Sequence, residues 1–172
     1  MTEQFKIGFI GLGIMGAPMA KNLINAKYEV YVYDIRQESI KNLVESGAIA
    51  TKNSQDLGEK VDVVVIMVQD SANSEEAIIS DNGVLNTLKK GTTIIDMSSI
   101  SPLVSQKISK LCEQKGVDFL DAPVSGGEPM AISGDLAIMV GGKENVFKKF
   151  ESIFDVMGKS KVYCGKAGAG NT

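Results

Sequence analysis

A strand, a glycine loop and a helix follow one another at the start of the chain, and this succession constrains the fold more than any other feature. The apolar run at residues 5–10 is typical of a short buried strand, and it leads directly into Gly11-Leu-Gly13-Ile-Met-Gly16. Apolar residues recur at helical spacing from Met15 to Ile24. The sequence therefore predicts a βαβ unit whose glycine loop holds the pyrophosphate of a dinucleotide at the helix N-terminus.

The three glycines of this loop have separate roles in the prediction. Gly11 allows a tight turn, Gly13 lets a pyrophosphate approach the backbone, and Gly16 lets the helix pack closely against the strand. We expect every residue of the loop to contact the cofactor: Gly11, Leu12, Gly13, Ile14, Met15 and Gly16.

The second predicted strand, residues 29–33, ends in an acid that bears on the choice of cofactor. Asp34 lies at the expected spacing of roughly 20 residues from the loop, where a carboxylate accepts hydrogen bonds from the ribose hydroxyls of NAD. The same carboxylate repels the 2′-phosphate of NADP, although the nearby Arg36 offers that phosphate a positive charge. NAD(H) is therefore favoured and NADP(H) is the alternative, with Asp34, Ile35 and Arg36 as candidate contacts.

A second glycine-rich segment, residues 121–142, indicates a site for a small carboxylate. Ser125 offers a hydroxyl, and Gly126 and Gly127 have no Cβ that would keep an anion from the backbone N–H groups. Ser125, Gly126 and Gly127 are therefore candidate substrate-binding residues. A plain glycine turn between strands is the alternative interpretation.

Strand and helix patterns alternate along the whole chain of 172 residues, of which 44% are apolar. We expect one α/β domain with a Rossmann-like, doubly wound and mostly parallel sheet that has helices on both faces. Later strands are predicted at residues 62–68, 92–97, 118–122, 136–140 and 161–164. Later helices are predicted around Leu43, from Pro102 to just before Gly116, and as one helix from Glu144 to Met157.

Composition argues against several other classes of function. The net charge is only −3 and the lysine pairs are short, so we expect no nucleic-acid partner. The run at residues 63–68 is too short to cross a bilayer, and the first residues lack a basic signal region, which favours a soluble cytoplasmic protein. The chain has no histidine, and Cys112 and Cys164 lack a metal-binding spacing, so no metal is expected.

Four segments together resemble the β-hydroxyacid dehydrogenases, and the resemblance spans the whole chain: residues 11–23, 96–99, 121–142 and 168–171. Residues 98–103 and 126–129 look most like tartronate semialdehyde (2-hydroxy-3-oxopropionate) reductases, with 3-hydroxyisobutyrate dehydrogenases second and 6-phosphogluconate dehydrogenases third. The resemblance implies an NAD(P)-dependent oxidoreductase of small β-hydroxyacids or their semialdehydes. A nucleotide-binding module without catalysis is the alternative from another class.

The resemblance also implies roles for residues outside the glycine loop. Met67, Val68 and Asn73 match family positions that touch the cofactor, and Ser99 matches one near the nicotinamide. The Ser-Gly-Gly segment named above matches the substrate-carboxylate site of the family. Many members carry Leu-Pro where this chain has Val68-Gln69, so the sequence leaves the shape of that loop open.

In the family, the catalytic lysine is the last residue of a G-x-G-x-x-x-K pattern, and the glycines of residues 168–172 match the beginning of that pattern. We therefore expect no catalytic residue in this chain and a lysine beyond Thr172. The resemblance implies a dinucleotide-binding domain at residues 1–165 and the start of an interdomain helix at residues 166–172. The second, all-helical domain of the family is absent from the chain, and a homo-oligomer is expected for the full-length protein.

Overall fold

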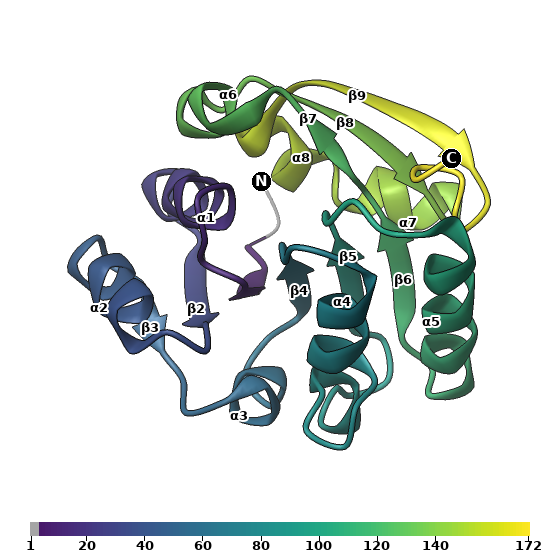
Figure 1. Cartoon of the computed structure of the whole chain (residues 1–172), viewed down its shortest axis with the longest axis horizontal. Coiled ribbons are helices and arrows are strands. Elements are labelled where there is room, and N and C mark those ends of the chain that lie inside the picture. Colours follow the sequence, from purple (N-terminus) through teal and green to yellow (C-terminus); the bar gives the residue numbers. More distant parts are fainter. Residues whose placement is uncertain (1–3) are drawn as a thin grey trace.

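A computed structural model describes residues 4–172, and residues 1–3 of the predicted domain lie outside the described residues. Within residues 4–172, nine strands form one sheet in the order β3-β2-β1-β4-β5-β6-β8-β7, with β9 paired to β8 (Figure 1). The strands are β1 (Lys6–Ile10), β2 (Glu29–Tyr33), β3 (Ile49–Ala50), β4 (Val63–Ile66), β5 (Thr93–Asp96), β6 (Asp118–Asp121), β7 (Val124–Ser125), β8 (Leu136–Gly141) and β9 (Gly158–Gly165).

Eight α-helices and one short 3₁₀ helix connect these strands in the part of the chain that the structure describes. The helices are α1 (Gly16–Asn25), α2 (Gln37–Glu45), α3 (Ser54–Gly58), α4 (Ser71–Ile78), η1 (Val84–Asn86), α5 (Pro102–Gln114), α6 (Gly127–Ser133), α7 (Glu144–Lys149) and α8 (Glu151–Met157). None of these helices is long and apolar enough to cross a membrane.

The sheet is parallel from β3 to β6, and β8 runs antiparallel to both β6 and β7. This arrangement confirms the predicted Rossmann-like, mostly parallel sheet. The strand order reverses between β1 and β4, because the chain builds outward from β1 in one direction and then restarts on its other side. In open α/β sheets, ligands bind beyond the carboxyl ends of the strands at such a reversal.

The central strand β4 shows why helices cover both faces. Its four residues are fully buried, and neighbouring side chains point to opposite faces of the sheet. Val63 and Val65 pack in the core that contains α1, α2, α6 and α8, whereas Val64 and Ile66 pack in the core that contains α3, α4 and α5. A continuous apolar run of this kind requires a helical layer on each side.

The region predicted as one helix from Glu144 to Met157 consists of two helices, and the prediction of a single helix was wrong. Phe150 separates α7 from α8 with a non-helical backbone (φ −107°, ψ 15°). Its buried ring packs 4.9 Å from the ring of Phe5, centroid to centroid. The turn lets both short helices bury their apolar residues against the sheet, which an apolar spacing of three and four could not reveal.

The structure contains short elements that the sequence patterns did not indicate. These are β3, α3, β7 and α6, each of seven residues or fewer. The strand predicted at residues 161–164 is longer and runs from Gly158 to Gly165 as β9. Residues 166–172 form turns, so an interdomain helix that starts there stays a prediction.

Candidate functional site

The glycine loop between β1 and α1 is packed so closely that two of its glycines admit no side chain. Gly11 has a φ of +98°, and a Cβ there would lie 2.0 Å from the Met67 carbonyl oxygen. A Cβ at Gly16 would lie 1.9 Å from the Gly11 carbonyl oxygen. A Cβ at Gly13 would meet only Arg36 Nη2, at 3.7 Å. Gly11 and Gly16 are thus required by the fold itself, whereas the space beside Gly13 is open.

The start of α1 has the properties of an anion-binding helix end. This ten-residue helix has no acidic residue in its first turn and no side-chain cap. Its first turn closes through the Ala17 N–H, which donates to the Gly13 carbonyl oxygen at 3.0 Å. Free N–H groups and the positive end of the helix dipole therefore face the open side of the loop.

A cavity of about 1010 Å³ lies at this end of the sheet. It brings together all but one of the predicted cofactor contacts: Gly11, Gly13, Ile14, Met15, Gly16, Asp34, Ile35, Arg36, Met67, Val68, Asn73 and Ser99. Leu12 is the exception, because its side chain is buried in the core beneath the loop. Its predicted contact with the cofactor has no support from the cavity.

The carboxylate of Asp34 holds the loop in place from the end of β2. Oδ2 accepts a hydrogen bond from the Leu12 N–H at 2.7 Å, and Oδ1 accepts one from the Arg36 N–H at 2.8 Å. Arg36 Nε lies 3.8 Å from Oδ1, with its side chain 66% exposed. Asp34 thus has a structural role at the strand end, and it also lines the cavity next to the positive charge of Arg36.

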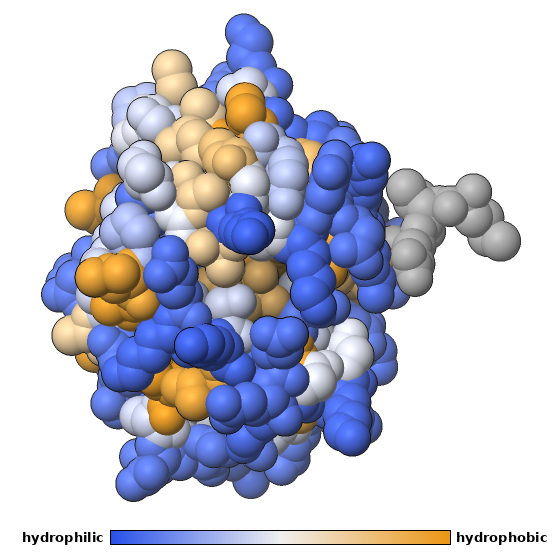
Figure 2. All heavy atoms as spheres, turned by 90° about the vertical axis from the view of Figure 1, so that its right-hand side faces the viewer, coloured by the Kyte–Doolittle hydropathy of each residue, from blue (hydrophilic) through white to orange (hydrophobic). Residues whose placement is uncertain are grey.

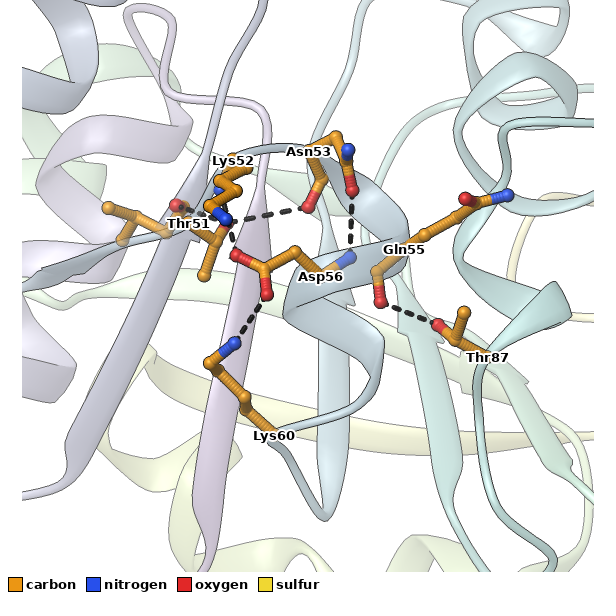
Figure 3. A network of polar contacts seen from close by, with 8 residues as sticks. Thr51, Lys52, Asn53, Gln55, Asp56, Lys60 and Thr87 are labelled. Atoms are coloured by element: carbon orange, nitrogen blue, oxygen red, sulfur yellow. Dashed lines mark hydrogen bonds and ion pairs between the residues drawn. The ribbon is translucent and has the colours of Figure 1, made fainter.

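One wall of the cavity comes from residues that sequence reasoning missed: Asn53, Ser54, Gln55, Gln69, Glu76, Ala77 and Asn82. Asn53 caps α3 by accepting a hydrogen bond from the Asp56 N–H at 2.8 Å (Figure 3). The Gln55 carbonyl accepts from Thr87 Oγ1 at 2.7 Å, which fixes α3 against η1. An asparagine followed three residues later by an acid is a helix-start signal, so this element was open to prediction.

Two buried groups hold the loops after β4 and β5 together. The Val68 N–H donates to Ser98 Oγ at 2.9 Å, and the Ser98 N–H donates to Asp96 Oδ1 at 3.0 Å. This chain of contacts presents Val68 and Ser99 on the same cavity wall. Asn73 lies in the first turn of α4, where its N–H donates to the cap residue Asp70, so Asn73 is not itself the cap.

Asp96 carries a perturbed carboxyl group at the base of this wall. Burial raises its pKa to about 6, against hydrogen bonds from Ser98 that lower it, and the negative charge of Asp121 adds to the increase. In the described part of the chain, its Oδ2 has no hydrogen-bond partner. The ionised form of Asp96 is therefore disfavoured in the folded chain.

Asp96→Asn should raise the free energy of unfolding at neutral pH. The ordinary pKa of an aspartate is 3.8, so between pH 3.8 and about 6 the folded chain keeps a proton on Asp96 that the unfolded chain has released. The free energy of unfolding of the wild type therefore falls as pH rises through this window. The loss is at most about 3 kcal/mol, at roughly 1.4 kcal/mol per pKa unit. Asparagine keeps an oxygen for the Ser98 N–H and does not ionise. Denaturant unfolding across this pH window tests the effect, and equal pH slopes for both proteins would contradict it.

The predicted carboxylate site lies apart from the cofactor cavity. Ser125 ends β7, and Ser125, Gly126 and Gly127 are exposed and do not line the cavity. Gly127 has a φ of +67°, and a Cβ there would meet only Pro129 Cδ, at 3.8 Å. The space beside Gly127 is therefore open, whereas a Cβ at Gly126 would lie 2.6 Å from Met130 Sδ. Asn22 of α1 donates from Nδ2 to the Ala131 carbonyl of α6 at 2.9 Å, which ties the two segments together.

Residues 6–165 match the family described as the NAD binding domain of 6-phosphogluconate dehydrogenase. The chain belongs to this family. The resemblance to the β-hydroxyacid dehydrogenases is confirmed by this match and by the relatives below, and the chain contains an NAD(P)-binding domain.

Named relatives of this NAD-binding domain are dehydrogenases and reductases. The chain is 42% identical over 172 residues to mitochondrial 3-hydroxyisobutyrate dehydrogenase of Rattus norvegicus, covering 100% of the chain and 51% of the relative. It is 42% identical over 167 residues to 2-hydroxy-3-oxopropionate reductase of Escherichia coli K12, covering 97% and 57%. The chain thus spans about half the length of the curated relatives it matches.

Solved structures have the same fold over nearly the whole chain. A putative oxidoreductase from Mycobacterium avium is 34% identical with a TM-score of 0.91, over 98% of this chain and 59% of that one. The 3-hydroxyisobutyrate dehydrogenase of Mycobacterium tuberculosis, studied with L-serine, is 31% identical with a TM-score of 0.91, over 98% and 57%.

Proposed function

We propose that the full-length protein transfers a hydride between NAD(H) and a small β-hydroxyacid or its semialdehyde. The observation that carries this proposal is the cavity at the strand-order reversal, lined by the glycine loop and Asp34 and flanked by Ser99. Relatives that share more than 40% of its residues are named as dehydrogenases or reductases of such acids.

In this proposal the residues of the chain bind and orient, while the nicotinamide ring supplies the hydride chemistry. The Gly13 side of the loop binds the pyrophosphate, and Ser99 lies near the nicotinamide. The substrate carboxylate binds the Ser125 hydroxyl and the amides of Gly126 and Gly127. All three residues are exposed, and the space beside Gly127 is open. A lysine that follows Thr172 in the full-length protein protonates the forming alkoxide.

The finer assignment of substrate is also a proposal. We favour the reduction of tartronate semialdehyde, because residues 98–103 and 126–129 resemble those of tartronate semialdehyde reductases. The relatives named 3-hydroxyisobutyrate dehydrogenase are equally similar to the chain. A cytoplasmic location and a homo-oligomeric state stay predictions. The mitochondrial relatives do not point to the cytoplasm.

The full-length protein should turn over tartronate semialdehyde or 3-hydroxyisobutyrate, and the 172-residue chain alone should bind NAD(H) without measurable turnover. General acid catalysis is typically worth ~10²–10⁴-fold, and loss of a covering domain also removes substrate positioning. Steady-state assays of the full-length protein and of the 172-residue chain on tartronate semialdehyde, 3-hydroxyisobutyrate and 6-phosphogluconate test the expected turnover and its absence. Cofactor binding without turnover by the full-length protein on any β-hydroxyacid would favour a non-catalytic nucleotide-binding module.

The NAD-binding domain should bind NAD(H) more tightly than NADP(H). The Asp34 carboxylate lines the cavity and would face a 2′-phosphate at short range, whereas it accepts hydrogen bonds from a free ribose. Calorimetric titration of both cofactors measures the preference, with Arg36→Ala as the companion variant. Equal or tighter NADP(H) binding that is lost in Arg36→Ala would assign the selection to Arg36, whose side chain is 66% exposed and free to turn toward a phosphate.

A further inference from the structure

A buried carboxylate ties the last residues of the chain to the sheet, and none of the roles above uses it. Asp121 ends β6 and is fully buried, and its Oδ1 accepts a hydrogen bond from the Gly168 N–H at 2.7 Å. Its Oδ2 accepts one from the Asn171 N–H at 3.2 Å. A buried carboxylate is costly unless it is hydrogen-bonded, so these two amides are its compensation. In the part of the chain that the structure describes, no lysine or arginine pairs with it.

Two glycines make room for this contact. A Cβ at Gly141 would lie 2.6 Å from Asp121 Oδ1, and a Cβ at Gly170 would lie 2.9 Å from Oδ2. Side chains at these positions would push the carboxylate and the terminal segment apart. The sequence therefore leaves the backbone of residues 168–171 in direct contact with the end of β6.

The same segment is held from a second direction by Asn171. Its Oδ1 accepts from the Ile100 N–H at 3.1 Å, and its Nδ2 donates to Ser105 Oγ of α5 at 3.3 Å. Ile100 directly follows Ser99, which lines the cofactor cavity. Residues 168–171 are thus fixed between β6 and the loop that carries Ser99. Figure 2 views the molecule from the side on which the chain ends in Figure 1, and apolar and near-neutral residues gather in the upper half of that face.

We propose that Asp121 is a positioning residue that fixes where and in which direction the chain continues after Thr172. The proposal rests on the proposed function in one respect, namely that the proton donor follows Thr172. Such a donor must come within hydrogen-bond reach of the substrate oxygen, and a misplacement of about 1 Å can cost ~10²-fold in rate. Asp121 therefore acts on the reaction through the segment it anchors, without contact to the substrate.

Asp121→Asn in the full-length protein tests this role. Asparagine has the same shape as aspartate, but one of the two carboxylate oxygens is replaced by an NH₂ group. That group cannot accept a hydrogen bond, so either the Gly168 or the Asn171 N–H loses its acceptor. Hydrogen exchange at the Gly168 and Asn171 amides should accelerate, and kcat should fall by about 10²-fold. The dissociation constant of NAD(H) should stay unchanged, because Asp121 does not line the cofactor cavity.

Asp118→Asn is the matched control, since it makes the same change at the other end of β6. Asp118 is partly exposed and pairs with Lys143 Nζ at 3.6 Å, so exchange, kcat and cofactor affinity should all stay at wild-type values. If Asp121→Asn does not fold, Asn171→Ala loosens the same segment by removing the contacts to Ile100 and Ser105.

Three outcomes would overturn the proposal: unchanged exchange at Gly168 and Asn171, unchanged kcat, or parallel losses of kcat and cofactor affinity that indicate general disorder. Failure of the proposed function is a separate result, because wild-type protein would then show no turnover. In that case the exchange rates of the two variants and the control still support or overturn the anchoring role of Asp121.

Discussion

Gly13→Val in the full-length protein is expected to abolish NAD(H) binding and to leave the fold intact. A Cβ at this position meets only Arg36 Nη2, at 3.7 Å, so the substitution fills open space where the pyrophosphate is proposed to approach. Loss of two hydrogen bonds to a charged group, at roughly 1.5–3 kcal/mol each, raises the dissociation constant by about 10²–10⁴-fold. Calorimetric titration measures the loss, and a thermal melt close to that of the wild type shows that the variant is folded.

Gly16→Val serves as the contrasting variant in the same loop. Its Cβ would lie 1.9 Å from the Gly11 carbonyl oxygen, so it should destabilise the fold as well as the site. The pair separates the glycine needed for packing from the glycine needed for ligand approach. Wild-type affinity in a folded Gly13→Val protein would show that the pyrophosphate does not bind this side of the loop.

Gly127→Val should remove substrate use while cofactor binding persists. The space beside Gly127 is open, because a Cβ there would meet only Pro129 Cδ, at 3.8 Å, so a valine side chain occupies the space proposed for the substrate carboxylate. Two lost hydrogen bonds to a carboxylate, at roughly 1.5–3 kcal/mol each, lower kcat/KM by about 10²–10⁴-fold. Gly127 does not line the cofactor cavity, so the dissociation constant of NAD(H) should stay near the wild-type value.

Backbone strain at Gly127 needs its own control, because a φ of +67° is unfavourable for valine. Gly91 has a φ of +90°, and a Cβ there would have no neighbour within 4 Å. It lies just before β5, at the amino end of that strand. Gly91→Val therefore carries a similar strain without touching the proposed site. A comparable fall in kcat/KM for both variants would mean that strain, and not a blocked carboxylate site, explains the loss.

The sequence alone predicted those elements whose apolar spacing, glycines and capping residues all indicate the same structure. The glycine loop and the strand that ends before Asp34 were predicted with accurate bounds, because their spacing follows from the geometry of a βαβ unit. Long amphipathic stretches such as α5, with its Ser101 cap and Pro102 start, were equally clear.

The misses have two physical causes: tertiary contacts that leave no periodic trace, and elements too short to show a period. The break at Phe150 depends on a ring that packs against Phe5, more than a hundred residues away in the chain. The wall formed by α3 was missed because five residues are too few for a period of 3.6 to stand out. The anchoring of residues 168–171 by Asp121 rests on backbone amides, which every sequence possesses, so only the structure reveals it.

The cofactor cavity and the Ser125 segment occupy separate stretches of the carboxyl edge, and this separation has an evolutionary consequence. Every residue that lines the cavity lies between Ile10 and Ser99, whereas Ser125, Gly126 and Gly127 of the proposed carboxylate site lie beyond β6. Substitutions of Ser125, Gly126 or Gly127 therefore change no residue that lines the cavity. Under the proposed function, a lineage with this plan is free to acquire new acids as substrates while it inherits its cofactor site unchanged.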